Sequence, residues 1–223
     1  MTEQAAQPGA PGGAHRHYLP AMGRDRLLPV YDLCTRLLGV RTAHGYLADQ
    51  AAIEPGQDVL EIGCGTGNLA LLVARRQPGA RVVGLDPDPK ALALAGRKAS
   101  RRGVALQLDR GFGDALPYPD GSFDRVLSAF MLHHLEPAEK PAMLREIVRV
   151  LRPGGRLHLL DMGGSEHPPH GFLARRTHAG PRIQENLGDR IPQLMREAGL
   201  GDARETGQVQ IRVGRCAAFQ GMR

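Results

Sequence analysis

Val59-Leu60-Glu61-Ile62-Gly63-Cys64-Gly65-Thr66-Gly67-Asn68 is the stretch that predicts the centre of the fold. An apolar run ending in an acidic residue is typical of a strand buried on both faces, and residues 69–74 continue as an apolar helix. Glycines in the turn allow positive φ angles and close approach of a ligand, while the helix start offers unpaired N–H groups. We therefore expect a strand, a tight turn and a helix that together hold a small polar ligand.

The glycine spacing and the next strand narrow the class of ligand. A dinucleotide fingerprint reads G-x-G-x-x-G, whereas this turn reads G-x-G-x-G, which by itself fits either a nucleotide-like ligand or merely a tight turn. The following strand, residues 81–86, ends in Asp86, about 20 residues further on, where a carboxylate can accept hydrogen bonds from both hydroxyls of a ribose. Two neighbouring strand ends are thus expected to present complementary groups to one ligand.

Strand and helix patterns alternate along the rest of the chain. Asp88 is expected to cap a helix that begins at Pro89, and the Pro-Gly-Gly run at 153–155 is expected to turn tightly into a strand. The pattern predicts helices at about 66–76, from 88 onward, 136–151 and 191–198, and strands at 81–86, 104–108, 123–129, 156–162, 202–206 and 210–219. This alternation predicts an α/β fold with a mostly parallel sheet, helices on both faces and an antiparallel final hairpin.

The chain is expected to form one domain with an N-terminal extension. Residues 1–14 are rich in Ala, Gly, Pro and Gln and predict a flexible tail. Residues 15–55 predict a helical cap, with a break at Gly39 and a further helix at about 42–52. Residues 56–223 then form the core, in which the polar stretch 163–182 is expected to be a loop.

Composition and charge exclude several classes of protein. The 223 residues are 42% hydrophobic, which suffices for a single core, and no apolar run approaches the roughly 20 residues that span a bilayer. With no signal peptide, the protein is expected to be cytoplasmic. The net charge of +6 is dispersed, and pairs such as Arg97-Lys98 end a helix, where cations complement its dipole. No aromatic residues interleave with the basic ones, so a solvated surface is favoured over a nucleic-acid groove.

Cysteine and histidine spacing predicts no metal site. Cys34, Cys64 and Cys216 have no metal-like spacing and are expected to be reduced, mostly buried thiols. The later histidines are His158, His167, His170 and His178. Together with Asp161 they match no helical pattern of metal ligands, and the two prolines within the run at 167–170 exclude a helix there.

Further motifs follow the glycine-rich turn in a fixed order. They are Gly84-Leu85-Asp86, Gly113-Asp114-Ala115-Leu116-Pro117, Ser122-Phe123-Asp124 and Leu132-His133-His134-Leu135. This series, from about residue 58 to residue 155, resembles the successive motifs of class I S-adenosylmethionine (SAM) dependent methyltransferases. It is most similar to the small-molecule branch that includes the ubiquinone and menaquinone C-methyltransferases. The resemblance implies a Rossmann-like sheet of seven strands, SAM as cofactor and S-adenosyl-L-homocysteine as product.

The resemblance also implies a cofactor site. The backbone around Gly63 and Gly65 would hold the methionine part, and Asp86 the ribose hydroxyls. Asp114 and the N–H group of Ala115 would meet the adenine. The full implied set, which adds two residues beside the methyl group after the fourth strand, is Glu61, Gly63, Cys64, Gly65, Asn68, Asp86, Pro87, Asp114, Ala115, Ala129 and Phe130. Taken singly, these glycines also fit simple turns, and the two aspartates also fit solvated loops.

His133 is the candidate general base. In the similar plant O-methyltransferases a catalytic histidine stands at the matching place in an L-H-D-W segment, but here the Asp and Trp are replaced by His134 and Leu135. A neutral imidazole could accept a hydroxyl proton near pH 7. Packing or a helix start is the alternative role for both histidines. In similar enzymes the N-terminal cap shapes the acceptor pocket, so Tyr18 and Tyr31 are candidate lid residues, with packing against the sheet as the alternative. His134 is the further candidate on the substrate side.

The leading hypothesis is a methyltransferase that acts on an O, N or C atom of a small molecule, as a monomer or homodimer. Such acceptors include phenols, quinone precursors, amines and natural-product intermediates. A second hypothesis is an RNA or DNA methyltransferase, although residues 128–131 lack the N-P-P-[FY] type of loop that grips an extruded base. A third is a SAM-binding regulator without transfer activity.

Overall fold

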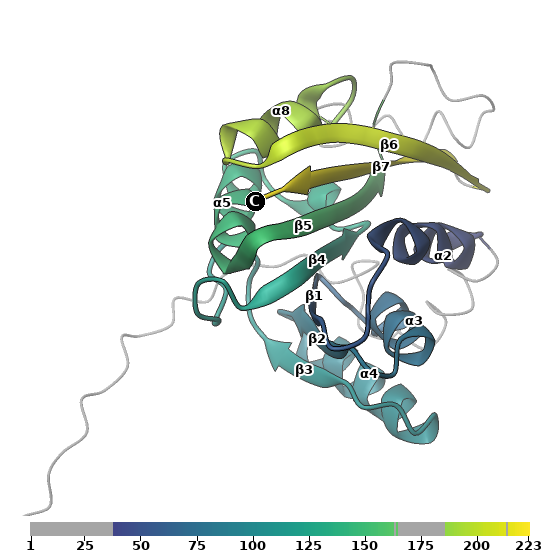
Figure 1. Ribbon diagram of the computed structural model, residues 1–223. Helices are drawn as coiled ribbons and strands as arrows, with labels where there is room; N and C mark the ends of the chain where they lie inside the picture. The colour runs from purple at the N-terminus through teal and green to yellow at the C-terminus, as the bar shows by residue number, and fades with distance from the viewer. Residues whose placement is uncertain (1–37, 163, 165–185, 213) are drawn as a thin grey trace, which may run out of the picture.

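The computed structural model of the chain describes residues 38–162, 164, 186–212 and 214–223. Figure 1 shows the elements, which in chain order are α2 (Val40–Ala51), β1 (Asp58–Ile62), α3 (Asn68–Arg76), β2 (Arg81–Asp86), α4 (Pro89–Arg101), β3 (Gln107–Arg110), β4 (Phe123–Ala129), the 3-10 helix η3 (Leu132–His134), α5 (Glu139–Val150), β5 (Leu151–Met162), α8 (Arg190–Glu197), β6 (Gly201–Ile211) and β7 (Gly214–Met222). The predicted tail, most of the predicted cap and nearly all of the predicted 163–182 loop lie outside the described residues.

The strands form one seven-stranded sheet in the order β3-β2-β1-β4-β5-β7-β6. Strands β1 to β5 pair in parallel, while β7 lies antiparallel between β5 and β6. This confirms the predicted fold class. The strand order reverses direction between β1 and β4, and in such sheets ligands bind at the carboxyl ends of the strands beside that switch point. The topology therefore predicts a ligand site at the carboxyl ends of the strands, where the predicted motifs lie.

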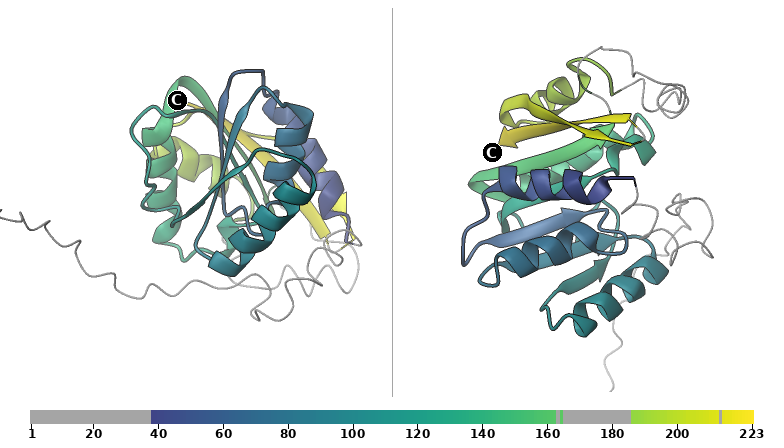
Figure 2. Two further views of the ribbon diagram at one scale, coloured as in Figure 1. Left: turned by 90° about the horizontal axis from the view of Figure 1, so that it is seen from below. Right: turned by 90° about the vertical axis from the view of Figure 1, so that its right-hand side faces the viewer.

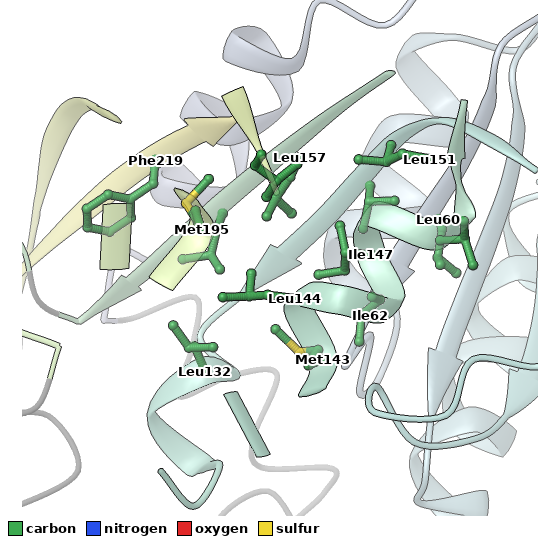
Figure 3. Close-up of a cluster of buried hydrophobic side chains, with 14 of the residues drawn as sticks. Leu60, Ile62, Leu132, Met143, Leu144, Ile147, Leu151, Leu157, Met195 and Phe219 are labelled. Atoms are coloured by element: carbon green, nitrogen blue, oxygen red, sulfur yellow. The ribbon is translucent and has the colours of Figure 1, made fainter. Parts of the chain in front are cut away.

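Helices cover both faces of the sheet (Figures 1 and 2). Helices α2, α3 and α4 lie on one face, and α5 and α8 on the other. Strand β1 shows why the sheet must be covered twice: it is buried at Val59, Leu60, Glu61 and Ile62, so both of its faces need a packing partner. Figure 3 shows the core under α5, where Met143, Leu144 and Ile147 meet side chains from the strands and Met195 of α8; the labelled strand residues are Leu60, Ile62, Leu151, Leu157 and Phe219.

Two predicted strands have different bounds in the structure. The third begins at Gln107 rather than Val104, because the Val104 N–H donates to Ala99 O and closes the end of α4 instead. The fifth begins at Leu151, five residues before the prediction, since Leu151 already pairs with Phe123. The Pro-Gly-Gly run at 153–155 is thus an irregularity inside β5, where the register shifts, and not a turn before it.

Helix ends and the final hairpin also differ from the prediction. Helix α3 starts at Asn68 because Gly67, at φ 74°, takes the left-handed cap position. The helix expected at 136–151 is α5, which begins at Glu139 and ends at Val150, and the separate 3-10 helix η3 precedes it. Strand β6 runs to Ile211 and β7 begins at Gly214, so the hairpin turns later than predicted, because β6 continues through a bulge between Glu205 and Gly207. Asp88 caps α4 as predicted, and its carboxylate accepts from Lys90 N at 2.8 Å.

Candidate functional site

A cavity of about 690 Å³ opens at the carboxyl ends of β1, β2 and β4. Its volume lies within the roughly 300–1,000 Å³ range of small-molecule sites. Asp86 and Asp114, 28 residues apart in the chain, line it together beside Gly63. The predicted residues that line it are Glu61, Gly63, Cys64, Gly65, Asn68, Asp86, Pro87, Asp114, Ala129, Phe130 and His134. The motifs therefore converge on one crevice, as their order in the chain requires.

The turn after β1 is held in a conformation that favours glycine. Gly63, Gly65 and Gly67 have φ angles of 72°, 50° and 74°. The N–H groups of Gly63 and Cys64 both donate to Leu85 O, at 2.8 and 3.0 Å, which ties the turn to the end of β2. A Cβ at Gly65 would meet no heavy atom within 4 Å. The turn thus exposes main-chain atoms at a position where a side chain would project into open space.

Asp86 organises the ends of two elements around the cavity. Its Oδ2 accepts from Gly65 N at 2.8 Å, and its Oδ1 accepts from Asp88 N at 2.9 Å. Burial raises the pKa of this carboxyl above its usual value, although both N–H groups oppose the shift. Each oxygen has capacity for a second hydrogen bond. The carboxylate can therefore fix the glycine turn and also accept two ligand hydroxyls.

Two acids in the cavity wall keep a buried oxygen without a hydrogen-bond partner among the described residues. They are Glu61 Oε2 and Asp88 Oδ2, on side chains that are only 3% exposed in each case. Burial, followed by the charge of Asp86, raises the pKa of Glu61 well above its ordinary value, against the Ala70 N–H bond and Lys98. A buried carboxylate oxygen of this kind calls for a donor or a cation from a ligand. The ammonium of a bound amino acid fits that requirement.

The loop after β3 contributes the predicted adenine side of the site only in part. Gly111, Phe112, Gly113 and Asp114 line the cavity. The N–H of Ala115 donates to Phe112 O at 3.2 Å within an isolated bridge, and Ala115 lies outside the lining. The N–H group expected to meet an adenine nitrogen is therefore engaged within its own loop in this structure.

The end of β4 brings an aromatic contact to the cavity. Phe130 has the left-handed φ of 56°, which is uncommon for a bulky residue, and its N–H donates to Leu160 O at 2.8 Å. Its ring lies 5.9 Å from that of His44 on α2, and both residues line the cavity. Removal from water, and then the charge of Lys98, lower the pKa of His44 to about 4. His44 is therefore a neutral imidazole at pH 7.

His133, the predicted base, lies outside the cavity lining. Its ring Nδ1 is 2.5 Å from Oδ1 of Asp161, and its backbone N–H donates to Oδ2 of the same buried carboxylate. Burial alone would lower its pKa, but the charge and hydrogen bond of Asp161 outweigh burial and raise it. The ring of His133 lies 4.1 Å from that of His134, which does line the cavity. The two neighbouring histidines thus have different surroundings.

Several lining residues escaped the sequence reasoning. None of them was assigned a role from the sequence: some belong to the quoted motifs, and the others reach the cavity from a helix or from positions that flank a motif. They are His44, Ile62, Thr66, Leu85, Asp88, Ala91, Gly111, Phe112, Gly113, Met131, Leu135, Glu136 and Glu139. The sequence signalled Asp88 only as a helix cap. Nothing in the pattern of α2 distinguished His44 from its neighbours on the helix.

Other sequence expectations concern features outside the cavity. The candidate lid residues Tyr18 and Tyr31 lie outside the described residues, as do Cys34 and three of the histidines after residue 160. Cys64 and Cys216 are free and buried, as expected. No helix in the described part of the chain is long and apolar enough to cross a membrane. The described residues also contain no group of three or more His, Cys, Asp or Glu side chains suited to a metal ion.

Comparison with known proteins agrees with this geometry. The model of a family described as a methyltransferase domain matches residues 59–155. A demethylmenaquinone methyltransferase of Thermus thermophilus is 42% identical over 150 residues, which cover 66% of this chain and 66% of that protein. A 2-phytyl-1,4-naphthoquinone methyltransferase of Synechococcus elongatus is 35% identical over 157 residues, which cover 68% of this chain and 65% of that protein. The chain thus spans just under two thirds of the length of these relatives.

Solved structures share the fold. Phosphoethanolamine N-methyltransferase 2 of Haemonchus contortus, solved in complex with SAM, superposes with a TM-score of 0.72 at 17% identity, covering 91% of this chain and 58% of that chain. The strand order, the glycine turn at the end of β1 and the matched sequences agree with one another. The chain therefore belongs to the class I SAM-dependent methyltransferase family.

Proposed function

We propose that the protein transfers a methyl group from SAM to a ring carbon of a quinol-type small molecule. The observation that carries the cofactor is the convergence of Glu61, Gly65 and Asp86 on one cavity, with Glu61 Oε2 buried and lacking a partner among the described residues. The acceptor class is supported by the names of relatives that act on demethylmenaquinone and on a phytyl naphthoquinone.

The residues present fit the cofactor. Asp86 would hold the ribose hydroxyls, because each of its oxygens has room for a second hydrogen bond. Glu61 would hold the ammonium group, which would complete the partners of its buried oxygen. The open space at Gly65 would admit the ligand against the main chain, and Asp114 would lie toward the adenine.

The cavity also has an apolar portion that suits a flat acceptor ring. Phe130, Met131 and Leu135 line it, together with the imidazoles of His44 and His134. The apolar side chains would hold an aromatic ring and exclude water, which supplies a large part of catalysis for an in-line displacement. His44, neutral at pH 7, offers one donor nitrogen and one acceptor nitrogen to a ring hydroxyl.

The chemistry requires an electron-rich carbon on the acceptor. When bound, SAM supplies an electrophilic methyl group on its sulfonium. A quinone ring is electron-poor, so the acceptor would be the reduced quinol, whose ring carbon forms the new bond as the sulfur–methyl bond breaks. The ring C–H proton is then lost when aromaticity returns. The role of the protein is to orient the ring and to accept protons. The imidazoles of His44 and His134 line the cavity and could accept a proton, and His133 stays a prediction as the general base.

The test combines binding with a panel of acceptors. Calorimetry would measure SAM and S-adenosylhomocysteine affinity, and labelled SAM would then be offered with a demethylmenaquinol analogue of short side chain, a catechol, a primary amine and transfer RNA. Label on a ring carbon of the quinol, located by mass spectrometry, supports the proposal. Label on oxygen or nitrogen would change the acceptor class, and label confined to RNA would favour the nucleic-acid hypothesis. SAM binding without transfer to any acceptor would favour a regulator.

A further inference from the structure

Lys98 lies on α4, yet its side chain reaches the glycine turn of the cavity. Its Nζ donates to Asn68 Oδ1 at 2.7 Å and to Thr66 Oγ1 at 3.1 Å. From the sequence, this lysine was expected to complement the dipole at the end of α4, and it does lie in the last turn of that helix. The contacts with the turn are an additional role that the helical pattern did not indicate.

A close approach between the turn and α4 makes these contacts possible. A Cβ on Gly67 would come within 2.9 Å of the Cβ of Ala95, so the backbone of the turn packs against this fully buried residue of α4. Lys98 stands three residues after Ala95 and hence on the same side of the helix. The glycine that allows the turn to contact α4 therefore also brings the lysine within reach of Thr66 and Asn68.

The chemistry of Lys98 fixes the direction of the side chains it holds. An ammonium group can only donate, so Asn68 must turn its amide oxygen toward Lys98 and carry its two N–H donors on the other side. Thr66 likewise accepts from Lys98, which leaves its hydroxyl hydrogen directed elsewhere. Both residues line the cavity. The lysine thereby selects an arrangement in which this part of the wall is rich in donors.

This donor group shares the cavity with Glu61, the buried acid described above. A wall with a carboxylate at one point and oriented donors backed by an ammonium at another is complementary to an amino-acid zwitterion. We infer that Lys98 is a positioning residue for the carboxylate at the amino-acid end of SAM and that it acts through Asn68 and Thr66, while Glu61 receives the ammonium. This inference rests on the proposed function.

The experiment compares two ligands that differ only in that carboxylate. Calorimetry would measure the affinity of the full-length protein for SAM and for decarboxylated SAM, which keeps the sulfonium and ammonium. In Lys98→Met the affinity for SAM should fall about tenfold, the size expected for hydrogen bonds to a charged group, while that for decarboxylated SAM stays within about twofold. Lys98→Arg should retain most of the SAM affinity. Arg97→Met, which removes the neighbouring exposed charge of α4, should change neither.

A second variant keeps the test independent of the stability of Lys98→Met. Asn68→Asp retains an oxygen for Lys98 but replaces the N–H donors with a second carboxylate oxygen, so it should weaken SAM and leave decarboxylated SAM unaffected or tighter. The inference is overturned if Lys98→Met weakens both ligands equally, since that would indicate a general role in the shape of the turn. Unchanged SAM affinity in both variants would also overturn it. Absence of SAM binding by the unmodified protein would instead refute the proposed function itself.

Discussion

The imidazole of His133 is held by the buried carboxylate of Asp161, with 2.5 Å between Nδ1 and Oδ1. Asp161 also accepts from the backbone N–H of Met162 at 2.6 Å, so a second hydrogen bond fixes the carboxylate at the end of β5. Because the pair links the segment after β4 to β5, it contributes to the stability of the edge that carries the cavity.

The first prediction concerns how this pair depends on pH. The folded pKa of His133 lies above the ordinary value of 6.5, so its stabilising effect is complete below about pH 6.5 and is lost as the pH rises through the folded pKa. In His133→Asn, the deficit in the free energy of unfolding relative to the unmodified protein should therefore be larger at pH 6 than at pH 9. Urea titrations at both pH values measure it. A deficit that grows with pH would contradict the assignment.

The second prediction concerns acid sensitivity at His158. Burial lowers its pKa to about 4, with Arg125 and Arg156 acting in the same direction, and its Nε2 has no hydrogen-bond partner among the described residues. The unfolded chain then binds the extra proton more readily, so stability is present above about pH 6.5 and is lost as the pH falls toward 4. His158→Leu should reduce the stability lost between pH 7 and 4.5 by on the order of 2 to 3 kcal/mol. Equal losses in both proteins would refute the prediction.

The third prediction concerns Asp86. Replacing it with Ala removes the acceptor of Gly65 N and Asp88 N as well as the proposed ribose contact, so the affinity for S-adenosylhomocysteine should fall by more than about tenfold. Calorimetry measures this change directly. Asp120→Ala, on an exposed acid that pairs with Arg149 away from the cavity lining, is the control and should bind normally. Intact binding by Asp86→Ala would remove the basis of the cofactor site.

The fourth prediction separates two glycines of one turn. Gly65→Ala and Gly67→Ala both place a Cβ at positive φ, which costs about 1 kcal/mol or more. At Gly67 the Cβ also meets Ala95 at 2.9 Å, so this variant should lose more stability, about 2 to 3 kcal/mol in all. At Gly65 the Cβ enters open space beside the cavity, so ligand affinity should fall more than stability does. Thermal melts would measure the stability of both variants, and calorimetry would measure their ligand affinity. A greater loss of stability in Gly65→Ala than in Gly67→Ala would refute the prediction.

The sequence allowed the central part of the fold to be predicted because its signals are local. The apolar run at Val59–Ile62, the glycine turn and Asp86 each fall at a strand end, and parallel strands bring their carboxyl ends to one edge. Helix caps such as Asp88 are also local, since a carboxylate two residues from an N–H group needs no distant partner. These features predicted the sheet, the position of the cavity and part of its lining.

The errors arose where distant contacts override local preference. The Pro-Gly-Gly run reads as a turn, but Leu151 pairs with Phe123 in the sheet, and the N–H of Gly154 donates to Arg223 O at the far end of the chain. The pairing of strands distant in sequence therefore converts the turn into an irregularity within a strand. No window of sequence around residue 153 contains that information.

By itself, the order of motifs determined that this chain folds as a class I methyltransferase with a crevice beside Gly63. Each motif lies at the end of a strand, and the parallel sheet brings these strand ends together at one edge. Only the tertiary structure decided which side chains enter that crevice from other elements. His44 on α2 lines it, Lys98 on α4 contacts the lining residue Asn68, and Asp161 on β5 holds His133, which lies outside the lining. Such placements depend on how helices pack across the sheet, a long-range property that the spacing of residues within each helix does not encode.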